Sequence, residues 1–220
     1  MGTITRGFAN NITTSGVLLP ASLNNNSIAN VTAYNASVPT GNMVLISSQT
    51  ASNSASISFT TGIDSTYKEY QFWFINIHPQ TDGAEFEFNM STDGGSNYNV
   101  IKTTTYFSAY HAEADDTATL NYQTSRDLAQ STSFQNLGYS DSNNDDASLS
   151  GTLQLFNPSS TTYVKHFISA NNVMHAYPMP LSSYVAGYFN TTSAINAIQF
   201  RYDSGNIDDG IIKMYGVKKS

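Results

Sequence analysis

Hydrophobicity with a period of two runs through most of this 220-residue chain, and it constrains the fold more than any other feature. In AEFEFNM (84–90), the apolar side chains fall at alternate positions and the polar side chains fall between them. Successive side chains of a β-strand point to opposite faces of the sheet, so this alternation predicts a strand with one face in water. Residues 55–60 (ASISFT) follow the same pattern. The chain is therefore expected to be built largely from strands.

Residues 70–77 (YQFWFINI) are apolar at both sets of alternate positions, which predicts a central strand covered on both sides. Further segments rich in β-branched and aromatic residues complete a set of predicted strands. The full set is 43–47, 55–60, 70–77, 84–90, 100–107, 149–156, 163–169, 183–189, 195–202 and 211–217.

Turn sequences separate several of these strands, at 92–97 (TDGGSN), 157–160 (NPSS) and 208–210 (DDG). Glycine permits a positive φ, and Asn and Asp tolerate one, as tight turns require. No segment has a helical stripe, although 125–130 (SRDLAQ) is predicted to form one helical turn with Ser125 as its cap. Many strands, short turns and almost no helix predict an all-β fold, an antiparallel β-sandwich or barrel.

Two stretches do not fit the strand pattern. Residues 1–40 are rich in Asn, Ser and Thr, and we expect them to form an irregular N-terminal arm or attachment segment. The rest of the chain, 41–220, is then the β-sandwich domain, with a long insertion around 108–148. An insertion of that length is usually either functional or part of an interface. The N-terminus lacks the apolar core of a signal peptide, so we expect no secretion signal.

The composition narrows the classes of function. Charged residues make up only 11% of the chain, nine basic and 16 acidic, for a net charge of −7. An ordinary soluble domain has about 25%. So few basic residues cannot form a basic face, which argues against nucleic acid as a partner. The chain has no cysteine, which excludes disulfides and thiolate metal sites, and no run of about 18 apolar residues that would predict membrane insertion.

The best candidate for acid–base chemistry is the pair Glu85 and Glu87, which share one face of a predicted strand. Paired carboxylates can hydrolyse glycosidic bonds. Some sandwich glycosidases carry a Glu-x-Asp-x-x-Glu pattern, but here Met90 stands where the last carboxylate is required. We therefore expect a solvated strand face, no catalytic residues and no enzymatic activity. The four histidines also lack any metal-ligand spacing: His78, His111, His166 and His175.

The loop 141–146 (DSNNDD) resembles the opening of a calcium-binding loop, because oxygen ligands stand at its first, third and fifth positions. It lacks the glycine expected at the sixth position, which is Asp146, and the glutamate expected at the twelfth, which is Thr152. We assign no metal and no cofactor, and leave open whether Asp141, Asp145 and Asp146 hold a cation in a looser site.

Aromatic residues in or near predicted loops are the best candidates for binding. Tyr and Phe with few charges are typical of subunit interfaces, and Tyr with Asn and Asp also suits sugars. The low charge favours a subunit interface over a sugar site. We expect the loops 108–148 and 171–183 to contact a neighbouring subunit, and leave open that they bind a receptor. The residues are Tyr106, Phe107, Tyr110, Tyr122, Tyr139, Tyr177 and Tyr184.

Several stretches resemble small virion structural proteins of tailed bacteriophages, especially marine and cyanobacterial ones. The closing stretch has the pattern SGNI…G-x-I-x-MYG (204–216), similar to the last strand pair of many phage head and tail surface proteins. These are strand-and-turn phrases rather than chemical signatures. The resembling stretches are 1–16, 59–82, 91–100, 151–168 and 184–217.

The resemblance implies a jelly-roll-like β-sandwich in the virion, made in the host cytoplasm, with no catalytic residues to transfer. We expect a bacteriophage structural protein in a capsid decoration, head fibre or tail fibre. Its partners would be copies of itself, as a homotrimer by analogy, and other virion proteins. The alternative is a host-attachment module at a fibre tip that binds a receptor or a surface glycan. The sequence does not distinguish head from tail or fix the oligomer number.

Overall fold

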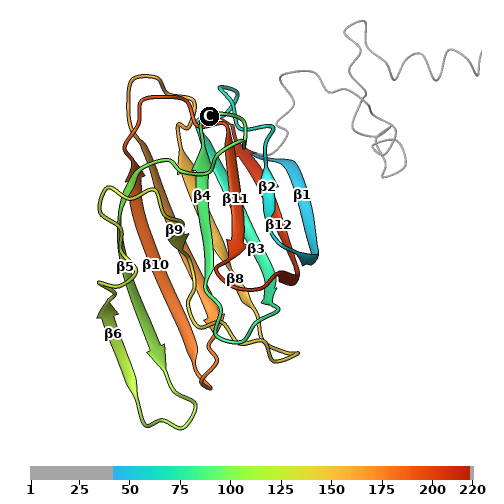
Figure 1. Cartoon of the computed structure of the whole chain (residues 1–220), viewed down its shortest axis with the longest axis vertical. Helices are drawn as coiled ribbons and strands as arrows, with labels where there is room; N and C mark the ends of the chain where they lie inside the picture. Colours follow the sequence, from blue (N-terminus) through green and yellow to red (C-terminus); the bar gives the residue numbers. More distant parts are fainter. Residues whose placement is uncertain (1–41, 219–220) are drawn as a thin grey trace, which may run out of the picture. The chain divides into compact units, whose positions relative to one another are not determined.

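The computed structural model describes residues 42–218, which form 12 β-strands and no helix (Figure 1). The predicted N-terminal arm, 1–40, lies outside the described residues. The strands are β1 (Met43–Ser54), β2 (Ile57–Phe59), β3 (Glu69–Pro79), β4 (Phe86–Ser91), β5 (Lys102–His111), β6 (Ala118–Tyr122), β7 (Gln135–Asn136), β8 (Leu149–Phe156), β9 (Lys165–Met174), β10 (Pro180–Phe189), β11 (Ala197–Tyr202) and β12 (Ile207–Val217).

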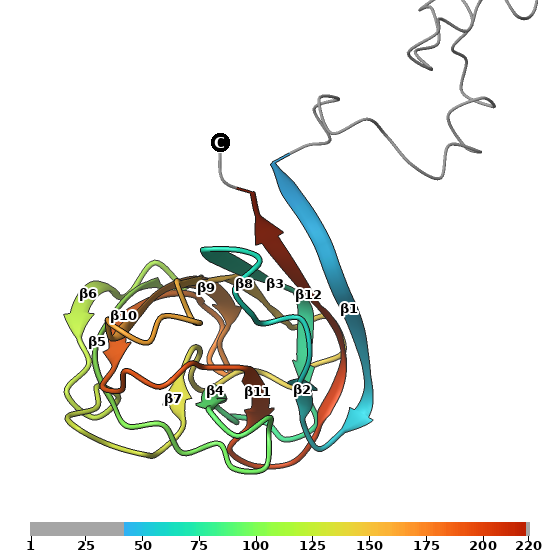
Figure 2. The same cartoon turned by 90° about the horizontal axis from the view of Figure 1, so that it is seen from above.

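The strands form two antiparallel sheets that pack as layers (Figure 2). The larger sheet has the order β1-β12-β3-β8-β9-β10-β5-β6, and the smaller has the order β2-β11-β4-β7. Four of the pairs are nested along the chain: β1 with β12, β2 with β11, β3 with β8, and β4 with β7. A long antiparallel ribbon wound into two four-stranded sheets is a jelly roll. The predicted all-β, jelly-roll-like sandwich is confirmed.

Two additional hairpins extend the larger sheet beyond this eight-stranded jelly roll. The β9–β10 hairpin pairs with β8, and the β5–β6 hairpin pairs with β10. The extension lengthens one layer only, so the larger sheet projects past the smaller one (Figure 1).

Phenylalanine side chains fill the space between the sheets. Phe200, on β11, lies at their centre, with its ring centroid 5.2 Å from that of Phe74 and 5.5 Å from that of Phe72. Phe86 and Phe88 stack against the same ring from β4. All five are buried, and burial of such large apolar surfaces is the main stabilising contribution in a sandwich without disulfides.

Strand β3 corrects the prediction that both of its faces are covered. Tyr70, Phe72 and Phe74 face the core, whereas Trp73 on the opposite face is 38% exposed. The pairing register shifts between Phe74 and Ile77, where Asn76 has a φ of 50°. This bulge turns Ile77 back into the core, although strict alternation would put it on the same face as Trp73.

Strand β4 corrects the prediction of a strand with one face in water. Residues 128–136, here called the strap, follow β6 in the chain. They lie between β5 and β4 and cover the polar face of β4. The strap pairs with β5 where Lys102 and Ser131 exchange backbone hydrogen bonds, and it reaches β4 through β7. The amide of Asn89 donates to the carbonyls of Thr132 and Ser133 within the strap. Glu87 and Asn89 are consequently buried.

The insertion at 108–148 therefore supplies the end of β5, all of β6, and the strap, which ends with β7. The helical turn predicted at 125–130 is misplaced: the hydrogen-bonded turn spans 123–127, where the backbone N–H groups of Arg126 and Asp127 donate to the carbonyl of Gln123, and 127–130 form no helix. The predicted loop at 171–183 is also wrong, since its two ends continue β9 and β10.

Candidate functional site

The outward-facing side of the five strands β8, β9, β10, β5 and β6 is the most distinctive surface of the described residues. We call it the outer face. None of its outward residues is Asp, Glu, Lys or Arg. They are Ser150, Thr152, Gln154 and Phe156 of β8, His166, Ile168, Ala170 and Asn172 of β9, Ser182, Tyr184, Ala186 and Tyr188 of β10, Thr103, Thr105, Phe107, Ala109 and His111 of β5, and Ala118, Leu120 and Tyr122 of β6.

Large apolar side chains protrude from the middle of this face. Phe107 and Tyr184 lie opposite each other on β5 and β10 and stack with ring centroids 5.1 Å apart. They are 42% and 43% exposed, and Ile168 beside them is 51% exposed. We call the Phe107–Tyr184 pair the aromatic stack. Contiguous exposed apolar surface of this kind marks an interaction site in a soluble protein.

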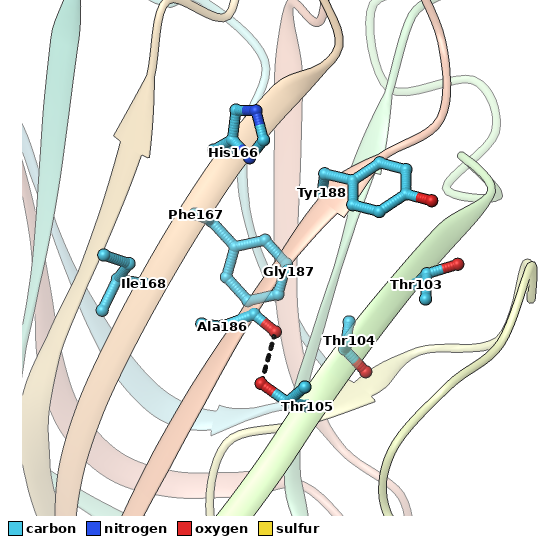
Figure 3. A pocket seen from close by; sticks show the side chains of 9 residues that line it. All are labelled: Thr103, Thr104, Thr105, His166, Phe167, Ile168, Ala186, Gly187 and Tyr188. Carbon is cyan, nitrogen blue, oxygen red and sulfur yellow. Dashed lines mark hydrogen bonds between the residues drawn. The ribbon is translucent and has the colours of Figure 1, made fainter.

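A hollow with a volume of about 520 Å³ lies next to the aromatic stack, two residues away along β5 and β10. Figure 3 shows the side chains that line it. Ala186 on β10 lies opposite Ile168 on β9 and opposite Thr105 on β5. The hollow forms between Ile168 and Thr105 because the side chain of Ala186 is small. The rings of His166 and Tyr188, 6.2 Å apart, border its upper end in the view of Figure 3. The hollow combines aromatic rings, an imidazole and threonine hydroxyls, and its lining includes no Asp, Glu, Lys or Arg.

The structure confirms some of the predicted exposed aromatics and corrects others. Phe107, Tyr122, Tyr177 and Tyr184 are exposed as predicted. Tyr110 is half-buried against the core. The prediction for two other tyrosines was wrong: Tyr106 and Tyr139 are buried, because Tyr106 stands at an inward position of β5 and its ring packs against that of Tyr139. Burial raises the pKa of Tyr106.

Glu85 and Glu87 do not border an open cleft. Arg126 Nη2 lies 2.6 Å from Glu85 Oε1, and Asn136 donates to the other oxygen of that carboxylate at 2.7 Å. Arg201 Nε lies 2.7 Å from Glu87 Oε1. Burial raises the pKa of Glu87, and the Arg201 charge opposes that shift. The predicted solvated face was wrong, because these carboxylates bind arginines beneath the inserted segment.

The two arginines also pack on aromatic rings. The guanidinium of Arg126 lies 3.9 Å from the ring centroid of Tyr139, and that of Arg201 lies 3.8 Å from the ring centroid of Phe134 in the strap. Stacking of a guanidinium on a ring adds to the ion pair. The sequence contained no signal for these pairings, because they join residues far apart in the chain.

The acidic loop does not bring its three aspartates together. Asp141 is buried and accepts a hydrogen bond from the Tyr202 hydroxyl at 3.1 Å, while Asp145 and Asp146 are on the surface side of the loop. Burial raises the pKa of Asp141 well above its usual range. Within residues 42–218, no group of three or more His, Asp or Glu side chains is arranged to hold a metal ion.

The four histidines have separate surroundings. His111 lies 2.8 Å from Asp115, and His78 lies 3.6 Å from Asp208. His175 accepts a hydrogen bond from the backbone of Tyr177. His166 alone borders the hollow, on the same side of β9 as Ile168.

No protein family, curated protein or solved structure matches the chain. The described residues contain no helix able to span a membrane.

Proposed function

We propose that this protein is a non-enzymatic structural subunit of a tailed-bacteriophage virion and that it assembles through the outer face. The observation that carries the proposal is the outer face itself, which exposes large apolar side chains and has no Asp, Glu, Lys or Arg among its outward residues. Depletion of charge with enrichment of Tyr and Phe is typical of the core of a protein interface.

Two further features support the proposal. Jelly rolls are frequent among viral capsid proteins, although the fold alone does not establish a function. The candidate acid–base residues, Glu85 and Glu87, each form an ion pair with an arginine. The subunit would be made in the host cytoplasm and built into the virion as a capsid decoration, head fibre or tail fibre. Its partners would be copies of itself, as a homotrimer by analogy, and other virion proteins.

The test is whether the full chain associates, and how salt affects the association. Contacts made by uncharged side chains are screened little, so the dissociation constant should change by less than about threefold between about 0.05 and 1 M NaCl. Sedimentation velocity at several protein concentrations measures this directly. A chain that stays monomeric at every concentration, or an assembly that dissociates steeply in high salt, would contradict the proposal.

The hollow supports a second candidate function, a host-attachment module that binds a neutral surface glycan. Tyr188 offers a ring face for a sugar, and Thr103, Thr105 and His166 offer hydrogen-bonding groups around it. Small-ligand sites typically combine such apolar walls with a few polar groups. A glycan array with the folded protein tests this, with Tyr188→Ala as the control. Binding that Tyr188→Ala abolishes would favour attachment, and an array without binding would count against it.

A further inference from the structure

We propose that the occupant of the outer face is a second copy of this chain. The two copies would pack face to face about a two-fold axis, with the aromatic stack of each inserted in the hollow of the other. This inference rests on the proposed assembly through the outer face. It adds the geometry of the contact, and it replaces the homotrimer, which rests on analogy alone, with a two-fold pair.

The area of the face is sufficient for a stable pair. With strands about 4.8 Å apart and a rise of about 3.4 Å per residue, the five strands present roughly 700 Å² of sheet before side-chain relief is counted. A standard protein interface buries about 800 Å² on each partner. Face-to-face packing of two such sheets at about 10 Å is also the arrangement that sandwiches use internally.

The face is complementary to itself, because a protrusion and a depression lie side by side on it. Tyr184 of the aromatic stack and Ala186 of the hollow are two residues apart on β10, and Phe107 and Thr105 are two residues apart on β5. Each separation is about 7 Å along the strand. A two-fold axis between these features brings each stack over the opposite hollow, which gives two equal contacts. Such reciprocity defines an isologous interface.

Charge limits the contact to this half of the larger sheet. Beyond β8, the outward side of the sheet carries Glu69 on β3 and Lys213 on β12. At the other end, Asp127 accepts a hydrogen bond from Tyr122 at 2.7 Å and so lies at the rim. Between these limits the outward side chains include no Asp, Glu, Lys or Arg. The nearest acidic groups lie towards one end of the strands, with Asp115 beside His111 and Glu113 near Asn172. A contact centred on the aromatic stack therefore buries few charges, which makes self-association favourable.

Two variants of the full chain separate the two halves of the contact. Ala186→Trp fills the hollow but keeps the aromatic stack. The double variant Phe107→Ala with Tyr184→Ala removes the stack but keeps the hollow. All three side chains point outward, so circular dichroism and thermal unfolding should show folded protein in both cases. Trp73→Ala is the matched control, because Trp73 is an exposed aromatic on the other half of the same sheet.

Sedimentation velocity should give wild-type particles of twice the 23.9 kDa chain mass. Each variant alone should dissociate at least about 100-fold more readily, since interfaces depend on a few buried aromatic anchors. Trp73→Ala should leave the dissociation constant unchanged. A mixture of the two variants should form a mixed pair, because one of the two stack-in-hollow contacts is then restored.

The outcomes separate this inference from the proposed function. A monomeric wild-type chain would overturn both. A stable assembly that ignores both variants, that has three-fold mass, or that pairs through the edge of β6 would overturn the face-to-face pair and leave assembly itself intact. Variants that dissociate singly but form no mixed pair would overturn the reciprocal geometry.

Discussion

Lys102 provides the most quantitative prediction, because a lysine is fully buried beneath the strap. Its ammonium nitrogen donates to the carbonyl of Ser133 and lies 5.8 Å from the ring centroid of Phe189. Burial lowers the pKa of Lys102 from 10.5 to about 7, and the Glu87 charge opposes this shift. The perturbation is Lys102→Met, which keeps the length of the side chain and removes the ionisable group.

The magnitude follows from the pKa. Lowering it from 10.5 to about 7 means that burial of this amine costs about 4 kcal/mol at pH 7. Substitution also removes one hydrogen bond, worth about 1 kcal/mol, but the Ser133 carbonyl keeps the Asn89 amide at 3.4 Å. Lys102→Met should therefore raise the free energy of unfolding at pH 7 by about 3 kcal/mol, the burial cost less the lost hydrogen bond.

The sign of the pH dependence follows from proton linkage. Between the folded pKa of about 7 and the unfolded pKa of 10.5, the unfolded chain binds more protons at Lys102 than the folded chain does. Stability must then increase with pH across this window. The free energy of unfolding of the wild-type protein should rise by about 2 kcal/mol from about pH 7 to about pH 9. Lys102→Met should lose that rise.

Urea unfolding at several pH values measures both effects, with Lys213→Met as the control at a partly exposed position of β12. Lys213→Met should keep the wild-type pH dependence. If Lys102→Met instead destabilises the protein and the wild-type stability is flat between pH 7 and 9, the amine is not buried as described.

Three further predictions concern the strap, the β3 bulge and the outer face. Asn89→Ala removes the donor to the Thr132 and Ser133 carbonyls and should lower the free energy of unfolding by about 2–4 kcal/mol. Urea unfolding measures this, and a variant as stable as the wild type would contradict the strap contacts. Gly210→Ala should lower the melting temperature, because Gly210 has a φ of 127° and a Cβ there would lie 2.7 Å from the Asn76 carbonyl oxygen; an unchanged melting temperature would refute that approach. Ile168→Asp should weaken association by at least about 100-fold without altering unfolding, since it puts an unpaired charge in the contact, and undiminished association in sedimentation would exclude Ile168 from it.

Local pattern was sufficient for much of the fold. The strand predicted at 149–156 coincides with β8, because Leu149, Leu153 and Leu155 fall at alternate positions and NPSS ends the strand. The all-β class followed from the same signal repeated along the chain. The two strands that the sequence did not predict, β6 and β7, have no such signal: β6 is exposed at nearly every residue, and β7 has only two residues.

The remaining differences have long-range causes. Ile77 faces the core because a bulge at Asn76 changes the register. Nothing in the sequence around Asn76 predicts its positive φ, so the bulge could not be predicted. Glu87 is buried because the strap, 40 or more residues further along the chain, folds over β4. The sequence predicted that a surface poor in charge and rich in aromatic residues would make contacts, but it did not predict that this surface is one side of a sheet. Which tyrosines reach it depends on strand register, which placed Tyr184 outside and Tyr106 inside.

The most direct test of assembly through the outer face is hydroxyl-radical footprinting of the full chain over a range of concentrations. Phe107 and Tyr184 should be oxidised readily in dilute protein and become protected as the chain associates, whereas Trp73, on the other half of the sheet, should react equally throughout. Equal oxidation of Phe107 and Tyr184 in dilute and associated protein would contradict the account, because the outer face would then remain open to water in the assembly.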